Sequence, residues 1–356
     1  IDATDNIGIY YYYYKLDNEE EVRTEENSHT FEGLENNSVH TITVRVEDAA
    51  GNISETKSKE VTVGLKGGSF ILASENAPTS HTTDWTGKES YYYTGNPNNW
   101  VSFAGFYWRI IRINGDETIR MIYSGSDATG PATSGTDTQI GTSAFNSSYN
   151  NNMYVGYMYQ SGQLHGLQKS STIKGVLDNW YTNNIVNKGY GKYVDGNAGF
   201  CGDRRVTSGT GTGTDSTTYQ SFTRISNSSP SLSCEDADIY TTMDSSTGNK
   251  ALTQPIGLIS ADEAMIGGIP WSVHNTNSYL YTEQNYWTMS PDRFNSTGIY
   301  QSGDANVFYV IWWGSFYSGD DANNTHGVRP VINLRSDVQI TGSGTTTDPF
   351  KVAGAE

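Results

Sequence analysis

The chain has 356 residues and a formal net charge of −17, and charged residues make up only 17% of it. This length favours two domains over one. The acidic balance excludes nucleic acid and an anionic membrane surface as partners. The sequence has no apolar run of about 18 residues, so we expect no membrane insertion in this part of the protein.

Residues 1–64 alternate between short apolar segments and turn-forming residues. We expect strands at residues 9–15, 21–25, 29–31, 41–47 and 59–63, with one of the turns at residues 36–37. Short strands at this spacing are typical of a β-sandwich.

Two motifs in this first region carry a resemblance. Residues 31–37 (FEGLENN) and 41–52 (TITVRVEDAAGN) resemble the later half of the immunoglobulin-like or fibronectin type III modules of bacterial surface proteins. The pattern of that family begins about two strands before Ile1. The resemblance therefore implies an all-β Ig-like sandwich over residues 1–64 that is incomplete at its N-terminus, with its first strands either removed or supplied by another module or chain.

A glycine-rich stretch separates this module from the rest of the chain. Residues 64–68 read GLKGG, and little periodicity follows, so we expect a linker at residues 65–78 and a second domain at residues 79–356. Long polar segments rich in Ser, Thr, Gly and Asn interrupt the second domain. They predict extended loops between its regular elements.

A hairpin is the clearest element of the second domain. Residues 106–113 and 118–123 alternate and flank an Asn-Gly pair, which is a strong hairpin signal. Alternation places Arg109, Arg112 and Arg120 on a polar face, where we expect them to be solvated or ion-paired.

The helical pattern is confined to two places. Residues 171–186 carry an apolar stripe at helical spacing: Ile173, Val176, Leu177, Trp180, Tyr181 and Ile185. Residues 260–268 predict a short helix with a serine N-cap and a glycine stop.

The second domain also resembles a known family. The resemblance rests on residues 96–100 (NPNNW), 106–115 (FYWRIIRING), 259–263 (ISADE), 286–291 (YWTMSP) and 327–334 (GVRPVINL). These motifs are similar to a domain of surface proteins from gut Firmicutes. The ending GVRPV resembles the last strand of C-type-lectin-like folds, which include relatives of the formylglycine-generating enzyme and the variable proteins of diversity-generating retroelements. The resemblance implies an α+β C-type-lectin-like domain.

The most aromatic stretch lies near the C-terminal end, at residues 308–317. Its parity predicts a strand with Phe308, Val310, Trp312 and Phe316 facing inward, and Tyr309, Ile311, Trp313, Ser315 and Tyr317 facing outward. A soluble strand rarely exposes so many large apolar side chains, which indicates a contact face. The alternative is a strand buried on both faces, which periodicity alone does not exclude.

The loop after this strand has the composition of antibody contact loops, rich in Tyr, Ser, Gly, Asn and Asp. We expect a ligand surface within residues 293–326. The candidate ligand-binding residues are Asn295, Tyr309, Ile311, Trp312, Trp313, Ser315, Tyr317, Asp320, Asp321, Asn323, Asn324 and His326.

The composition of this surface fits diversification by a retroelement. Adenine changes in an AAC-type codon yield Asn, Tyr, Ser, Asp, His, Ile and others. This set contains the outward positions Tyr309, Ile311, Ser315, Tyr317, Asp320, Asn323, Asn324 and His326. Trp313 is not reachable in this way. Tyr- and Asn-rich loops are also common on extracellular proteins that are not diversified.

The sequence offers three functional interpretations. The first is a secreted or cell-surface binding protein, adhesin- or receptor-like, whose partner is a protein or glycan on another cell, a phage or a host surface. The second is a lectin of fixed specificity that uses Trp312 or Trp313 as a stacking platform. The third is an enzyme related to sulfatase modification, which we do not favour because no HExxH, nucleophile elbow or CxxC motif is present.

The cysteines and the candidate metal ligands give little further information about function. Cys201 and Cys234 are the two cysteines of the chain, and we expect them to form a disulfide, with two reduced thiols as the alternative. They lie outside the late strands that carry the reactive cysteine pair of formylglycine-generating relatives. We expect no metal or other cofactor, and the one alternative is calcium at Asp320 and Asp321.

Overall fold

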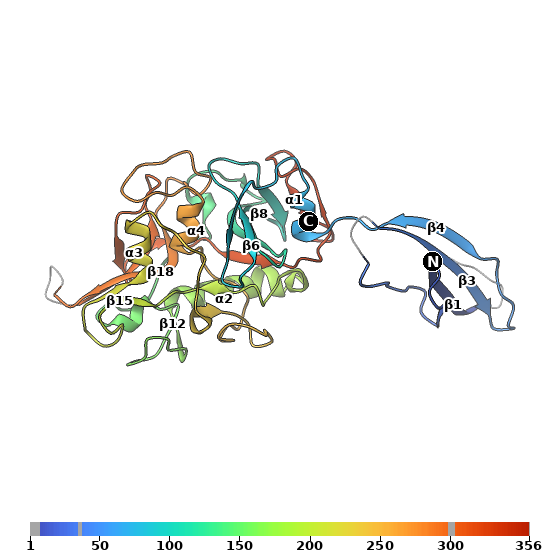
Figure 1. Ribbon diagram of the computed structural model, residues 1–356, viewed down its shortest axis with the longest axis horizontal. Helices are drawn as coiled ribbons and strands as arrows, with labels where there is room; N and C mark the ends of the chain where they lie inside the picture. Colours follow the sequence, from blue (N-terminus) through green and yellow to red (C-terminus); the bar gives the residue numbers. More distant parts are fainter. Residues whose placement is uncertain (1–7, 35–37, 298–302, 356) are drawn as a thin grey trace. The chain divides into compact units, whose positions relative to one another are not determined.

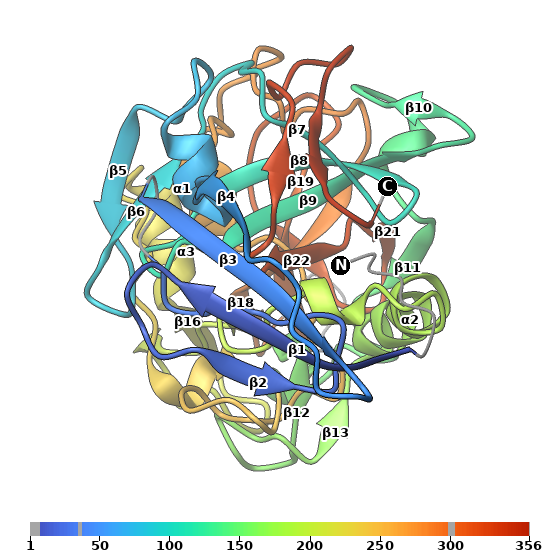
Figure 2. The same ribbon diagram turned by 90° about the vertical axis from the view of Figure 1, so that its right-hand side faces the viewer.

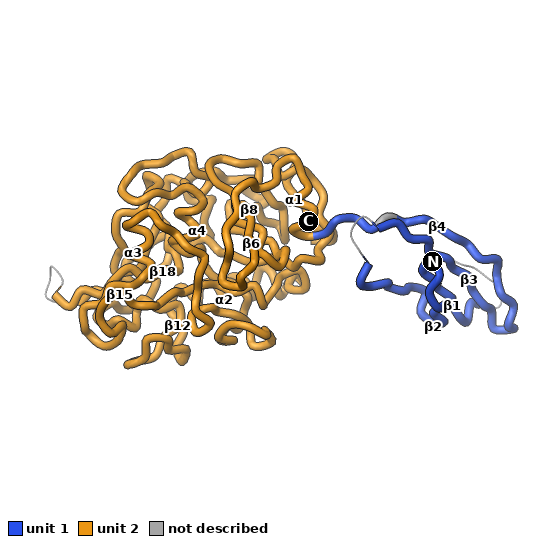
Figure 3. The backbone as a smooth tube through the Cα atoms, in the orientation of Figure 1, with its two compact units in different colours: residues 1–66 blue, residues 67–356 orange. Residues whose placement is uncertain are grey.

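The computed structural model describes residues 8–34, 38–297 and 303–355 (Figure 1). The predicted turn at residues 36–37 and residues 298–302 of the predicted ligand surface lie outside them. The chain divides into two compact units, residues 1–66 and residues 67–356 (Figure 3). Both units are built mainly from β-strands, as expected for an all-β module followed by an α+β domain.

Unit 1 is one antiparallel sheet of four strands in the order β2-β1-β3-β4. Its strands are β1 (Ile9–Leu16), β2 (Val22–Thr24), β3 (Val39–Asp48) and β4 (Lys57–Thr62). The strand predicted at residues 29–31 does not form. Instead, the His29 ring stacks on Tyr14 at 5.5 Å and meets Phe31 at 4.7 Å.

This sheet has little buried core. Among its described apolar residues, only Tyr14 and Leu16 are almost fully buried, while Val22, Val39 and Ile53 are exposed. The described part of unit 1 contains no second sheet. It therefore supplies one layer of the predicted sandwich.

Unit 2 contains two large sheets. The nine-stranded sheet consists of β5 (Ser80–Thr83), β6 (Glu89–Tyr92), β7 (Trp100–Phe103), β8 (Phe106–Ile113), β9 (Ile119–Ser126), β10 (Gly130–Pro131), β22 (Val331–Leu334), β23 (Ile340–Thr341) and β24 (Phe350–Val352). The seven-stranded sheet consists of β11 (Thr142–Ala144), β15 (Val206–Ser208), β16 (Thr217–Tyr219), β18 (Tyr286–Asn295), β19 (Asp304–Val310), β20 (Gly319–Asp321) and β21 (Thr325–Gly327). Two short pairs complete the strands: β12 (Met158–Tyr159) with β13 (Lys169–Ser170), and β14 (Phe200–Cys201) with β17 (Ile239–Tyr240).

Helices cover parts of these sheets. They are α1 (Gly67–Leu72), α2 (Thr172–Tyr181), α3 (Gln220–Ser226) and α4 (Ala261–Ile266), with short turns at η1 (Thr136–Thr138), η2 (Asn152–Val155), η3 (Thr182–Val186), η4 (Gly191–Tyr193) and η5 (Asp236–Asp238). Helix α2 lies beside β11, and α3 and α4 lie beside β18 (Figures 1 and 2).

The hairpin and both predicted helices are confirmed. Strands β8 and β9 pair across the Asn-Gly turn, and α2 begins after the Ser171 cap and continues into the π-helical turn η3. The apolar stripe is only partly right. Val176 is exposed, and Trp180 is half-buried, packed edge-on against Trp108 and Tyr123.

The predicted linker is largely part of unit 2. Helix α1 packs Ile71 into the core, and the Gly67 and Gly68 amides donate to the carbonyls of Val338 and Glu117 at 2.7 and 3.0 Å. A Cβ on Gly67 would lie 2.0 Å from the Ser336 carbonyl oxygen. These glycines are therefore required for close backbone packing rather than for flexibility.

The arginines of the hairpin are not solvated. Arg112 and Arg120 are fully buried, because β8 and β9 are covered on both faces rather than on one. Both guanidinium groups bind Glu263 of α4: Arg112 Nε lies 3.2 Å from Oε1, and Arg120 Nη2 lies 3.2 Å from Oε2. Arg109 is also buried and donates to the Pro97 carbonyl. The predicted ion pairing is found, whereas the predicted solvent exposure is wrong.

Glu263 also caps its own helix. Its Oε2 accepts from the Ser260 amide, and Ser260 Oγ accepts from the Glu263 amide, which is a complete capping box. Burial alone would raise the pKa of Glu263, but the charges of Arg120 and Arg112 outweigh it and the pKa is lowered. The carboxylate therefore stays ionised in the folded protein.

We expect Glu263→Gln to destabilise unit 2 by about 3–5 kcal/mol, because it leaves the buried guanidinium group of Arg120 without its counter-charge and that of Arg112 with Asp84 alone. Because the pKa of Glu263 is lower in the folded than in the unfolded chain, its contribution is present above the ordinary carboxyl pKa and is lost as the pH falls through the folded value. Urea unfolding of both proteins between pH 7 and pH 3 measures this. Glu75→Gln, at an exposed acid, is the matched control. A loss below about 1 kcal/mol at pH 7 would contradict the assignment.

Candidate functional site

The predicted outward strand ends earlier than its sequence pattern suggests. Strand β19 stops at Val310, and a tight turn follows, in which Ile311 and Ser315 pair across residues 312–314. Gly314 has φ 76°, and a Cβ at this position would lie 2.2 Å from the Asn275 carbonyl oxygen. Because the chain reverses here, the alternation of faces does not continue beyond Val310.

The inward and outward assignments therefore need correction in the turn. Phe308, Val310 and Phe316 are buried as predicted. Trp312 was predicted inward and is 54% exposed, whereas Ile311 and Ser315 were predicted outward and are buried. Because of the turn, the Trp312 side chain faces solvent, whereas the bridge residues Ile311 and Ser315 pack against the protein. A strand buried on both faces is also wrong, because Trp312 and Tyr317 remain exposed.

An exposed aromatic patch surrounds this turn. We define the aromatic patch by the following residues: Trp271, Val273, His274, Trp312, Trp313 and Tyr317. The Trp313 ring lies 5.1 Å from the Trp312 ring and 5.2 Å from His274. At the other end, Trp271 stacks parallel to Tyr317 at 6.4 Å. Tyr317 and Val273 are 65% and 60% exposed, so large apolar side chains face solvent across two loops.

Backbone hydrogen bonds hold these two loops together. The Ser272 amide donates to the Phe316 carbonyl at 2.7 Å, and the Phe316 amide donates to the Pro270 carbonyl at 2.8 Å. The Trp312 amide donates to Asn285 Oδ1, and Trp313 Nε1 donates to Ser315 Oγ, each at 2.8 Å. The patch is therefore presented on a fixed backbone, which lowers the entropy cost of binding.

Sequence reasoning missed half of this surface. Trp271, Val273 and His274 lie in a loop after α4 and were not among the predicted contact residues. Their signal was one Trp after a proline in a polar segment, without any periodicity. Only the three-dimensional pairing of residues 270–275 with residues 314–316 brings them next to Trp312.

Tyr309 and His326 form a separate, internally satisfied cluster. Their rings stack at 4.3 Å, and His326 Nε2 lies 2.8 Å from Asp320 Oδ2. Asn324 Nδ2 donates to the other Asp320 oxygen at 2.8 Å. Burial alone would raise the pKa of Asp320, but these hydrogen bonds lower it. The four predicted contact residues therefore bind one another and leave less of each side chain for a ligand.

The remaining predicted residues lie on either side of this cluster. Asn323 is exposed at the turn between β20 and β21, and Asn295 faces Asp304 in the pairing of β18 with β19. Asp321 accepts from Asn306 Nδ2 at 2.9 Å, and its pKa is raised by burial and by the nearby charges of Asp304 and Asp320. Within the described ranges, no group of three or more His, Cys, Asp or Glu side chains is arranged to hold a metal ion. The calcium alternative at Asp320 and Asp321 therefore has no support from the described residues.

A buried carboxyl also supports this surface. Asp292 lies within β18, and its side chain is fully buried. Its Oδ2 accepts from the Gly319 amide at 2.8 Å at the first residue of β20, two residues after Tyr317. Burial raises the pKa of Asp292. Asp292 therefore fixes the chain where it leaves the aromatic patch.

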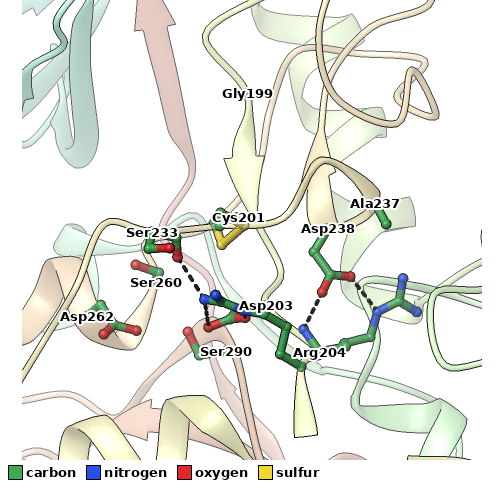
Figure 4. The surroundings of a disulfide bond; sticks show 12 residues. Gly199, Cys201, Asp203, Arg204, Ser233, Ala237, Asp238, Ser260, Asp262 and Ser290 are labelled. Atoms are coloured by element: carbon green, nitrogen blue, oxygen red, sulfur yellow. Dashed lines mark hydrogen bonds and ion pairs between the residues drawn. A yellow bond between two sulfur atoms is a disulfide. The ribbon is translucent and has the colours of Figure 1, made fainter. Parts of the chain in front are cut away.

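The predicted disulfide is present. Cys201 and Cys234 are bonded, with their Cα atoms 6.0 Å apart (Figure 4). The bridge joins β14 to the segment that follows α3. Figure 4 also shows Arg204 bound to Asp238, whose carboxylate accepts from the Arg204 backbone amide at 2.6 Å. Next to the bridge, Arg224 of α3 binds Asp203 at 2.5 Å and Asp262 at 2.7 Å.

None of the protein-family models, curated proteins or solved structures compared with this chain matches it. Among the described residues, no helix combines the length and apolar character that crossing a bilayer requires. The disulfide is consistent with an oxidising, extracellular environment.

We expect the double substitution Cys201→Ser with Cys234→Ser to cost about 3–4 kcal/mol of stability on the chain-entropy model, because the bridge closes a loop between residues separated by 33 positions. Urea unfolding with and without reductant measures it. The wild-type protein should lose stability on reduction, and the double variant should not respond. Equal stability of wild-type and variant proteins without reductant would contradict a stabilising role.

Proposed function

We propose that this protein is a secreted or cell-surface ligand-binding protein that uses the aromatic patch as its contact surface. The observation that carries the proposal is the exposure of Trp312, Tyr317 and Val273 on two loops that are fixed by backbone hydrogen bonds. Exposed Trp and Tyr on a rigid support are typical of binding hot spots. Isolated surface apolar residues are common, but two sets of contacting aromatic rings on neighbouring loops are not: His274 with Trp313 and Trp312, and Trp271 with Tyr317.

The family resemblance supplies the architecture of this proposal. Unit 2 is taken as a C-type-lectin-like domain, and unit 1 as a partial immunoglobulin-like or fibronectin type III module. The single open sheet of unit 1, with few buried apolar residues, fits a module that is completed by strands from a neighbour. The disulfide of unit 2 supports an extracellular location.

The partner in this proposal is a protein or glycan on another cell, a phage or a host surface. A lectin of fixed specificity is the second candidate, and it is favoured by the exposed indole of Trp312, which offers an apolar face to a sugar ring. An array of immobilised glycans distinguishes the two. Binding to one narrow glycan class through Trp312 supports the lectin, and binding to protein targets alone excludes it. Neither candidate is enzymatic.

We also propose that a retroelement diversifies the predicted ligand surface. Burial limits the positions at which such variation is tolerated. Ile311 and Ser315 are buried bridge residues, so variation there would disturb the turn. The positions that tolerate change are the half-buried and exposed ones: Tyr309, Tyr317, Asp320, Asn323, Asn324 and His326. The coding locus tests this directly. A reverse transcriptase gene beside a near-copy of the segment for residues 295–326, differing only at adenines, supports it, and the absence of both overturns it.

We expect Trp312→Ala and Tyr317→Ala each to weaken adhesion of protein-coated beads to target cells about 30-fold or more, with the melting temperature unchanged, because exposed hot-spot residues do not hold the core. The readout is bead adhesion to panels of bacterial and epithelial cells. Met243→Ala, at a 75% exposed apolar residue outside the patch, is the matched control. Phe308→Ala should instead unfold unit 2, at a cost of about 3–5 kcal/mol. Adhesion that survives both patch substitutions would contradict the proposed surface.

A further inference from the structure

Unit 2 contains a second candidate site that shares no residue with the aromatic patch. A cavity of about 330 Å³ is lined by the β5–β6 turn, the β8–β9 turn and two segments near residues 197 and 236–247. The lining residues that a ligand would meet include Trp85, Lys88, Asp116, Asn197, Asp236 and Ser246. This volume lies at the lower end of the range of small-molecule sites.

The wall formed by Trp85 is fixed. Arg112, which is held by Glu263, lies 4.7 Å from the centroid of the Trp85 ring. Asp84 stabilises the β5–β6 turn, because its carboxylate accepts from the Thr86 amide at 2.8 Å and from Ser90 Oγ at 2.7 Å. The indole is only half-buried. It therefore presents a rigid apolar surface to the cavity.

The two turns that frame the cavity touch each other. A Cβ on Gly115 would lie 2.3 Å from Lys88 Cβ, so no larger residue fits between them. Asn114, at the base of the second turn, is 7% exposed and donates from Nδ2 to Thr118 Oγ1 at 2.8 Å. Its Oδ1 has no hydrogen-bond partner among the described residues. This oxygen is enclosed by protein, and the amide is held by bonds from its Nδ2 to Thr118 and Asn333, so Asn114 fixes the second turn rather than offering an acceptor to the cavity.

Exposed polar side chains that bind no other described residue lie around the mouth of the cavity. The side chains of Asn197, Asp236 and Ser246 are exposed and have no hydrogen-bond or ion-pair partner in the described ranges. Among the residues that line the cavity, Asp116 and Asp236 carry negative charge and Lys88 is the one exposed cation. Arg112 is already neutralised by Glu263 and Asp84. This balance disfavours an anionic ligand.

We propose that this cavity binds a neutral saccharide unit. A sugar combines an apolar ring face, which fits Trp85, with hydroxyl groups that donate to Asp116 and Asp236 and accept from the Asn197 amide. The proposal does not depend on the function assigned to the aromatic patch.

The test is a titration of the full chain with free glucose, galactose, mannose and N-acetylglucosamine, followed by saturation-transfer NMR and calorimetry. Glucuronic acid and N-acetylneuraminic acid are the anionic comparison. We expect at least one neutral sugar to bind with a dissociation constant near the millimolar range that a small, polar site gives. Trp85→Ala should weaken this binding at least 10-fold, and Trp312→Ala should leave it unchanged.

A second variant covers the case in which Trp85→Ala fails to fold. Asn197→Ala removes an exposed side chain without internal bonds, and it should weaken sugar binding several-fold while the melting temperature stays constant. Three results overturn the proposal: no neutral sugar binds below about 50 mM, an anionic sugar binds more tightly than every neutral one, or binding persists in the Trp85 and Asn197 variants. Loss of sugar binding in Trp312→Ala alone would move the sugar site to the aromatic patch and would also overturn it.

Discussion

The buried ion network of Arg112, Glu263 and Arg120 connects the parts of unit 2 that carry its surfaces. Glu263 lies at the start of α4 and joins both strands of the central hairpin to this helix. Two residues before Glu263 along α4, the Ala261 amide donates to Ser290 Oγ of β18 at 2.9 Å. Helix α4 thus ties the nine-stranded sheet to the seven-stranded sheet. Because two buried cations depend on Glu263, this contact specifies one arrangement rather than several.

Both candidate sites contain residues or loops that are attached to this ion network or to α4. Arg112 lies over Trp85 and so fixes the wall of the polar cavity. In the other direction, α4 leads into the loop that carries Trp271, and its partner strand β18 carries Asp292, which anchors Gly319 after the aromatic patch. The protein therefore places exposed aromatic residues on loops while keeping the supporting backbone rigid, which is the usual way in which contact surfaces combine adaptability with low entropy cost.

Sequence patterns were sufficient where the local signal and the tertiary structure agree. The Asn-Gly hairpin, the helix that begins near residue 171 and the serine cap before α4 are local features, and each forms as predicted. Sequence patterns failed where the burial of a residue depends on residues far away in the sequence. Alternation cannot reveal that β8 is covered on both faces, so the pattern placed Arg112 on a polar face, solvated or ion-paired, rather than in the core. In the sequence, the inward–outward alternation continues through Trp312, but in the structure the turn at Gly314 ends it. The contribution of Trp271 depends on a pairing between segments about 40 residues apart, which no local sequence pattern encodes.

We expect the buried ion network to make both sheets and the patch-bearing turn one cooperative unit. Native-state hydrogen exchange of unit 2 measures this. The informative amides are those of Ile110, Met289 and Phe316, which donate to the carbonyls of Asn99, Ile259 and Pro270. All three should exchange with the same free energy, equal to that of global unfolding. Exchange of the Phe316 amide through a local opening several kcal/mol below the other two would show instead that the core does not hold the patch.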